Sequence, residues 1–300
     1  MTKPKHWLFT LALSLLMTST ACAAPKLQVT ASFSILADLV RVVGADRVEV
    51  NSLVGPDEDA HVFEPKPSDA KRILQSRLLV TNGLGFEPWM LRLIQVAGYR
   101  GVVTEASKGI QIRNMPAHGD AIGREIDPHA WQDPTHTMTY VRNIALALSQ
   151  LDAAGASIYA SNAEVYVKEL QQLDQWALSQ IAAIPPAKRK VITSHDAFGY
   201  FAAHYGVTFL APLGMSTDAD PSARDVAKLI RQIQREKIKA VFLENMSNPH
   251  LIEQIAQDTG VKLGPRLYVD ALSATDDAGS TYLKLMRHNV QTLLAGMQNN

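Results

Sequence analysis

The stretch SIYASNAEVYVKELQQLDQWALSQIAA, from Ser157 to Ala183, decides the fold because it predicts one unusually long helix. Apolar side chains recur in it at three- and four-residue steps and line one face, while the opposite face is polar. The apolar positions are Tyr166, Leu170, Leu173, Ala177 and Ile181, with Ile184 just beyond. Gly155 marks the start of the helix, Ser161 and Glu164 match a capping-box pattern near its first turns, and Pro185-Pro186 marks its end. At about 1.5 Å per residue this helix would be roughly 40 Å long, which exceeds the width of a small domain.

Short apolar runs alternate with helix-like stretches on both sides of this segment. Before it, strands are predicted over 27–31, 47–54, 77–82 and 101–104, and helices over 35–43, 67–75, 87–97 and 135–151. After it, strands are predicted over 190–193, 207–210, 239–243 and 266–269, and helices over 197–205, 222–236, 249–259 and 280–297. Residues 107–128 are polar and contain Gly and Pro, so an irregular surface loop is expected there.

Such alternation indicates parallel sheets with helices on their faces. The predicted fold is therefore α/β, with two α/β lobes, each with a central mostly parallel sheet flanked by helices, joined by one long backbone helix. The expected divisions are an N-terminal lobe over 24–156, the linking helix over 157–184 and a C-terminal lobe over 185–300.

Residues 1–23 have the pattern of a secretory signal peptide and predict a periplasmic protein. Lys3 and Lys5 form a basic start, Trp7 to Met17 is an apolar run too short to span a bilayer, and Ala21-Cys22-Ala23 is a small-residue cleavage site. An alternative makes Cys22 a lipid-anchored residue, although Ser19-Thr20-Ala21 before it lacks the usual Leu. Both alternatives predict export.

The composition removes several classes of function. Cleavage after Ala23 would remove Cys22, the only cysteine, so disulfides and thiolate metal sites are excluded from the mature chain. The net charge of zero argues against nucleic-acid binding, which requires an excess of Lys and Arg. The chain has no His-Glu-x-x-His, no Gly-x-Ser-x-Gly, no P-loop and no dinucleotide glycine fingerprint, so the common catalytic motifs are missing.

Four residues that could bind a metal follow predicted strands or lie in loops beside them. His195 follows strand 190–193, and Asp270 directly follows strand 266–269. His61 lies in the loop after strand 47–54, and His129 lies in a Pro-containing loop. Ligand-binding groups collect just past the carboxyl ends of parallel strands. Three imidazoles and one carboxylate that meet between two lobes would form a closed four-ligand site for a divalent metal.

Five motifs make the sequence resemble the metal-specific solute-binding proteins of zinc and manganese ABC importers, which are periplasmic solute-binding proteins of family 9 (cluster A-I). The motifs, in the order of that family, are AHVFEPKPSD (60–69), NGLGFEPW (82–89), DPHAWQDP (127–134), SHDAFGYF (194–201) and LYVDALS (267–273). The resemblance implies two lobes on a long backbone helix and a metal between them, bound by His61, His129, His195 and Asp270. It also implies that a monomer delivers the metal to an inner-membrane ABC permease with its cytoplasmic ATPase.

Departures from the family pattern bear on the cargo. Ala60 precedes the first ligand where relatives often have Pro or Glu, so Asp270 is expected as the fourth ligand. Apart from Asp127 at its end, the segment 113–127 contains only His118 and Asp120 of the His and Asp residues that would form a metal-collecting loop, and no such loop is expected. His195 stands where manganese-type relatives commonly have Glu, which favours Zn²⁺. Mn²⁺ or Fe²⁺ is the alternative, because Asp270 could bind through both oxygens.

Two other functions remain as alternatives. A secreted zinc hydrolase would need an open coordination position and a general base such as Glu64 or Glu244, and four protein ligands argue against such an enzyme. A surface adhesin could use the same fold and a lipid anchor on Cys22. Glu244 is expected to act through a hydrogen bond. The remaining histidines of the mature chain outside the loop are expected on the surface or in packing; they are His136, His204, His250 and His288.

Overall fold

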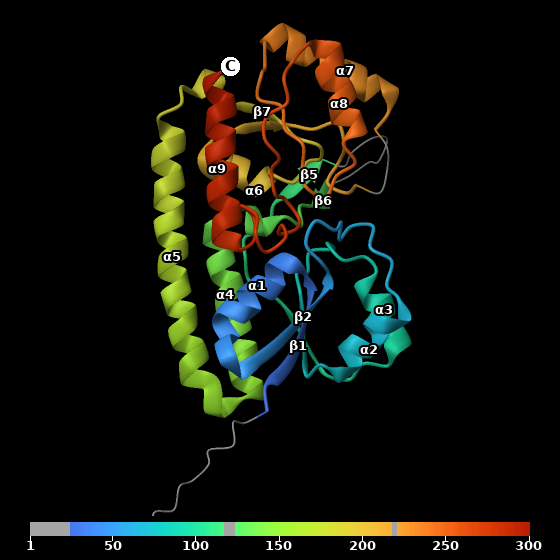
Figure 1. Ribbon diagram of the computed structural model, residues 1–300, viewed down its shortest axis with the longest axis vertical. Helices are drawn as coiled ribbons and strands as arrows, with labels where there is room; N and C mark the ends of the chain where they lie inside the picture. The colour runs from blue at the N-terminus through green and yellow to red at the C-terminus, as the bar shows by residue number, and fades with distance from the viewer. Residues whose placement is uncertain (1–24, 117–123, 218–220) are drawn as a thin grey trace, which may run out of the picture.

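Helix α5 (Ala156–Ala182) runs along one side of the molecule, and two lobes lie against it (Figure 1). This computed structural model describes residues 25–116, 124–217 and 221–300, so the predicted signal peptide 1–23 with Cys22, and also His118 and Asp120, lie outside the described residues. In the N-terminal lobe α5 packs against α1 (Ser34–Gly44) and α4 (Pro134–Leu151), and in the C-terminal lobe against α6 (Gly199–Tyr205) and α9 (Tyr282–Gln298). The prediction of two α/β lobes on one long helix is confirmed.

Helix α5 begins within one residue of the predicted start, with Gly155 as its N-cap, but the way this end is held differs from the sequence-based expectation. Ser161 and Glu164 lie inside the helix, and its N-cap is Gly155, which has no side chain to cap it. The preceding turn is instead held by Asp152, which accepts two hydrogen bonds from Arg47, at 2.8 and 3.0 Å, and one from the Tyr159 hydroxyl at 2.6 Å. The capping-box prediction is therefore wrong, because tertiary contacts position this end of the helix.

The N-terminal lobe is built on a four-stranded parallel sheet of order β2-β1-β3-β4. Its strands are β1 (Leu27–Phe33), β2 (Val48–Val54), β3 (Leu78–Thr81) and β4 (Val102–Glu105). Helices α1, α4 and α5 contribute to the core on one face, and α2 (Pro67–Gln75) and α3 (Met90–Ala97) cover the other. Because both faces are covered, the central strands β1 and β3 are buried along almost their whole length, as in other parallel sheets, although β1 contains Gln28, Thr30 and Ser32.

The C-terminal lobe has a shorter ladder of hydrogen-bonded strands than predicted. Strands β7 (Lys190–Ile192) and β8 (Thr208–Leu210) pair in parallel, but the predicted strands 239–243 and 266–269 form only isolated bridges through Val241 and Leu267. Side-chain amides replace part of the ladder. Asn289 bonds both backbone polar groups of Tyr268, at 3.0 and 2.5 Å, and so removes them from strand pairing. Helices α7 (Ala223–Glu236) and α8 (His250–Thr259) complete the lobe.

Residues 107–128 contain a short hairpin where an irregular loop was expected. Strands β5 (Asn114–Pro116) and β6 (Arg124–Ile126) pair antiparallel, and Asp127 N–H continues the pairing to the Arg113 carbonyl at 3.0 Å. The Tyr200 hydroxyl of α6 accepts from Arg113 N–H and donates to the Asp127 carbonyl, which attaches the hairpin to the C-terminal lobe. Across the described ranges, no helix is long and apolar enough to cross a membrane.

Candidate metal centre

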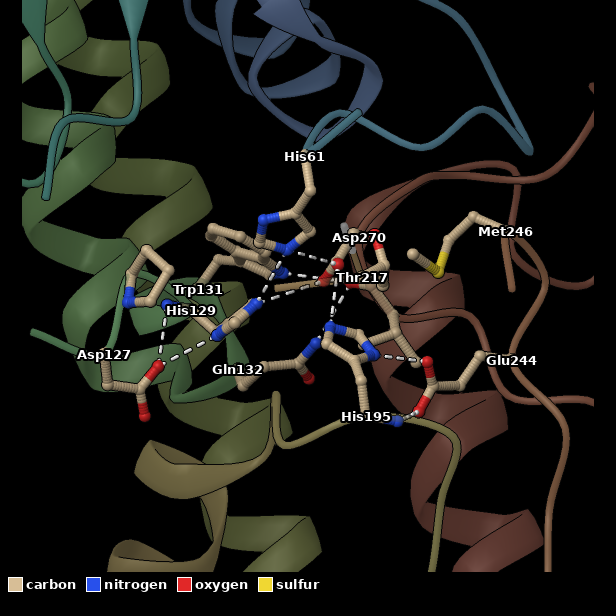
Figure 2. Close-up of polar contacts among 12 residues, drawn as sticks. His61, Asp127, His129, Trp131, Gln132, His195, Thr217, Glu244, Met246 and Asp270 are labelled. Atoms are coloured by element: carbon tan, nitrogen blue, oxygen red, sulfur yellow. Dashed lines mark hydrogen bonds and ion pairs between the residues drawn. The ribbon is translucent and has the colours of Figure 1, made fainter. Parts of the chain in front are cut away.

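The structure brings the four predicted residues together between the lobes (Figure 2). His61 lies in the loop after β2, and His129 lies between β6 and the short helix η2 (Ala130–Gln132). His195 follows β7, and Asp270 follows the bridge at Leu267. All four are buried, and their potential ligand atoms lie within 4.8 Å of one another.

The separations between these atoms match the coordination shell of a transition metal. Nε2 of His61 lies 3.2 Å from Nε2 of His129 and 3.2 Å from Oδ2 of Asp270. Nε2 of His195 lies 3.1 Å from the same Asp270 oxygen. Donors that bind a tetrahedral ion at about 2.1 Å lie about 3.4 Å apart, close to these values.

Burial without partners distinguishes this cluster from an ordinary hydrogen-bond network. Asp270 is fully buried, yet neither of its oxygens has a hydrogen-bond partner of acceptable geometry within the described part of the chain, and the same holds for Nε2 of His195. Buried polar atoms without partners are rare because each one costs free energy. The donor atoms therefore fit a cation, which would supply the missing partner for both residues.

Two carboxylates orient two of the imidazoles from behind. Oε2 of Glu244 lies 2.5 Å from Nδ1 of His195, and its Oε1 accepts from the backbone N–H groups of Ser194 and His195 at 2.8 and 3.1 Å. Oδ1 of Asp127 lies 2.9 Å from Nδ1 of His129 and accepts its backbone N–H at 3.0 Å. Both contacts leave Nε2 free to face the centre, as metal-binding histidines require.

The role of Glu244 as a hydrogen-bond acceptor confirms the sequence-based expectation, whereas Asp127 was missed. A signal for Asp127 exists in the sequence, since an Asp two residues before a His can accept from both the backbone N–H and the ring of that His. The Asp127-Pro128-His129 spacing has this form.

The loop that carries His61 is attached to both lobes. Oδ1 of Asp59 accepts His61 N–H at 2.8 Å, while its Oδ2 accepts the hydroxyl of Thr217 from the C-terminal lobe at 2.6 Å. Two residues earlier, Asp57 accepts from the Asn245 side chain at 2.8 Å. The Phe86 ring lies edge-on to the His61 ring at 4.8 Å, at the end of a turn in which Gly83 has a φ of 82°.

The charges of the site explain its pKa shifts. Burial opposes ionisation of Asp270, but the neighbouring His195 and His129 outweigh it and hold the pKa of Asp270 well below its usual value. Burial also opposes protonation of His195, yet the carboxylates of Glu244 and Asp270 raise the pKa of His195 well above the ordinary value. For His61, burial dominates and lowers the pKa. A cation that binds here must therefore displace a proton from His195.

Comparison with known proteins decides the family. Residues 29–296 match the family described as zinc-uptake complex component A, periplasmic. The chain belongs to this family. Its members are substrate-binding proteins of metal ABC transporters.

Relatives of this chain are described with different metals. The manganese-binding lipoprotein MntA of Halalkalibacterium halodurans is 31% identical over 284 residues, covering 93% of this chain and 91% of MntA. The Mn-bound periplasmic metal-binding protein from Candidatus Liberibacter asiaticus has a TM-score of 0.80 and 29% identity, and the match covers 91% of this chain and 100% of that protein. The periplasmic zinc-binding protein TroA of Treponema pallidum has a TM-score of 0.85 and 25% identity, over 91% and 99%.

Other polar residues of this family member lie outside the four-residue cluster. Glu64 is exposed, the His250 side chain is 85% exposed, and His288 bonds the Arg266 carbonyl at 2.8 Å. These positions agree with the surface and packing roles expected for the two histidines. His136 and His204 lie together elsewhere, beside Asp133.

Proposed function

We propose that this protein, a substrate-binding component of a metal ABC transporter, captures one divalent ion between its lobes. The ligands would be Nε2 of His61, His129 and His195 and a carboxylate oxygen of Asp270. The observation that carries the proposal is the buried Asp270 carboxylate, which has no hydrogen-bond partner of acceptable geometry among the described residues and is surrounded by three imidazole nitrogens. The ion is the cargo, and it would pass to an inner-membrane permease with its cytoplasmic ATPase. We propose a monomer as the working form.

We propose Mn²⁺ as the physiological cargo, in place of the Zn²⁺ that the donor set alone favours. Several relatives with similar coverage are named as manganese-binding proteins, which supports the manganese alternative more strongly than zinc. Affinity in vitro does not decide between them, because most nitrogen and oxygen sites bind Zn²⁺ more tightly than Mn²⁺ and cells select by availability. Fe²⁺ would occupy the same site, and TroA keeps zinc as the second candidate.

We propose binding without catalysis. Four protein donors leave no open position on a tetrahedral ion for an attacking water. Glu244 would be the nearest candidate base, but its two oxygens are committed to Ser194 and His195. A hydrolase on this site would have to break the contacts that orient His195.

We propose that the chain is exported and attached to the membrane surface through Cys22. The relatives named lipoproteins favour this alternative over simple release into the periplasm. The test is membrane fractionation and labelling with a radioactive fatty acid, comparing the wild type with Cys22→Ala. Label and membrane attachment that depend on Cys22 support the anchor. A wild type that is unlabelled and soluble would instead support a free periplasmic protein.

Uptake by cells tests the cargo directly. Cells that lack this protein should take up radioactive manganese more slowly than the wild type, with zinc uptake little changed, and the wild-type gene should restore the rate. A gene encoding His129→Ala should fail to restore it, because the ion would lose one of its four ligands. Selective loss of zinc uptake would overturn the choice of manganese, and unchanged uptake of both metals would contradict the transport role.

A further inference from the structure

A second cluster of histidine and carboxylate side chains lies where helices of both lobes meet beside α5. His136 comes from the first turn of α4 in the N-terminal lobe, and Asp133 is the N-cap of that helix. His204 comes from the last turn of α6 in the C-terminal lobe. Asp174 comes from the middle of α5. None of these residues belongs to the site between His61 and Asp270.

Two histidine nitrogens lie near the Asp133 carboxylate at distances that exceed those of hydrogen bonds. Nδ1 of His136 and Nδ1 of His204 each lie 3.7 Å from Oδ2 of Asp133. This separation is too long for a hydrogen bond but close to the roughly 3.4 Å that separates two ligands of a tetrahedral zinc ion. The other carboxylate oxygen, Oδ1, is already used, since it accepts from the backbone N–H and the hydroxyl of Thr135 at 2.8 and 2.7 Å.

Each of the two histidines has a ring nitrogen that is available to bind a metal. Nε2 of His204 lies 2.7 Å from Oδ1 of Asp174, which also accepts the Tyr205 hydroxyl at 2.9 Å. A carboxylate that holds one ring nitrogen in this way directs the lone pair of the other nitrogen outward, here toward Asp133. Nδ1 of His136 is buried and has no hydrogen-bond partner within the described ranges. Burial lowers the pKa of His136, which favours the neutral ring that a metal needs.

We propose that His136, His204 and Asp133 bind a second divalent transition-metal ion, with Zn²⁺ the best match to two nitrogens and one oxygen. Among the described residues only the cargo site has three or more ligand atoms within 4.8 Å of one another, so binding here draws the two rings closer together across Asp133. Water completes the coordination, because the two histidine side chains remain 20% and 26% exposed. Asp174 acts as the positioning residue for His204. Since α4 and α6 belong to different lobes, this ion joins the lobes at the side of α5, independently of the cargo.

Metal stoichiometry by native mass spectrometry tests the proposal on the metal-stripped mature protein titrated with Zn²⁺. The wild type should bind two ions, and His136→Gln and His204→Gln should each bind one. His129→Ala should lose the cargo ion and keep the second. Asp174→Asn should weaken the second ion roughly 10–100-fold, as loss of an orienting carboxylate does elsewhere.

Two features keep the test decisive. Retention of the cargo ion shows that the His136 and His204 variants are folded, and His250→Gln, which changes an exposed histidine on α8, should leave both ions in place. A wild type that saturates at one ion overturns the proposal. So does a second ion that His136→Gln and His204→Gln leave unchanged. Because His129→Ala affects only the cargo, failure of this proposal can be told apart from failure of the proposed function.

Discussion

Replacing Glu244 by Gln should weaken metal binding roughly 10–100-fold, or about 1.4–2.8 kcal/mol, although Glu244 itself need not touch the ion. Oε1 of Glu244 accepts the backbone N–H groups of Ser194 and His195, and its Oε2 faces Nδ1 of His195. A metal-bound His195 must donate its Nδ1–H. If the glutamine oxygen keeps the contacts with the backbone N–H groups, its NH₂ group faces the Nδ1–H of His195. Two donors then face each other, and the ring loses the hydrogen bond that orients it.

Asp127→Asn provides the matched comparison. Asp127 uses the single oxygen Oδ1 for both the ring and the backbone of His129, so the oxygen of an asparagine can take its place. The loss of affinity should therefore be smaller than for Glu244→Gln. Exposed Glu253→Gln on α8 should have no effect.

The affinities should be measured with Zn²⁺ and Mn²⁺ by competition with a chromogenic chelator over a range of pH. Burial lowers the pKa of His195, but Glu244 and Asp270 raise it well above normal, so the wild type must release a proton from His195 when it binds metal. In the Glu244→Gln variant, protons compete less with the metal for His195, so low pH weakens its metal binding less than that of the wild type. Its loss of affinity relative to the wild type should therefore grow as the pH rises. A variant as tight as the wild type, or an equal loss in Asp127→Asn, would refute the positioning argument.

Three further predictions concern stability and the His61 loop. Burial raises the pKa of Glu87 to about 7 from 4.5, so the folded chain retains a proton that the unfolded chain releases between those values. Urea unfolding of metal-free protein should then lose about 3 kcal/mol as the pH rises through this window, and Glu87→Gln should lack this loss. Leu170→Ala in the buried face of α5 should cost about 2–5 kcal/mol, against about 0.5 kcal/mol or less for exposed Val165→Ala, also by urea unfolding. Thr217→Val removes the hydrogen bond to Asp59 and should weaken Mn²⁺ binding by about 0.5–1.5 kcal/mol in calorimetric titration; unchanged affinity would separate this contact from the site.

Periodicity was sufficient for most of the fold because long helices such as α5 and α9 bury one face. The predicted helix over 157–183 matches α5 to within a residue at each end. Where side chains from distant segments replace local signals, prediction was wrong. Arg47, bonded to Asp152, holds the turn before α5 in place of the predicted capping box, and Asn289 takes the backbone partners that would have completed a predicted strand near Tyr268.

The candidate site was predictable at the ends of its strands and less so in its loops. His195 and Asp270 follow predicted strands and His61 and His129 lie in loops beside them, so position along the chain already selected all four, and the family motifs pointed to the same residues. The Asp127-Pro128-His129 spacing carries a signal for the backbone contact of Asp127 and was overlooked, whereas its contact with the ring also depends on the rotamer of His129. The cluster around Asp133 needed three helices to be placed together, so the sequence suggested only separate surface histidines.

The central claim is that His61, His129, His195 and Asp270 bind one cargo ion, and anomalous diffraction from crystals grown with Mn²⁺ tests it most directly. The account predicts a manganese peak between the lobes, at roughly 2.0–2.3 Å from the three Nε2 atoms and an oxygen of Asp270. A peak that lacks any of these four contacts, or no peak between the lobes, would contradict it.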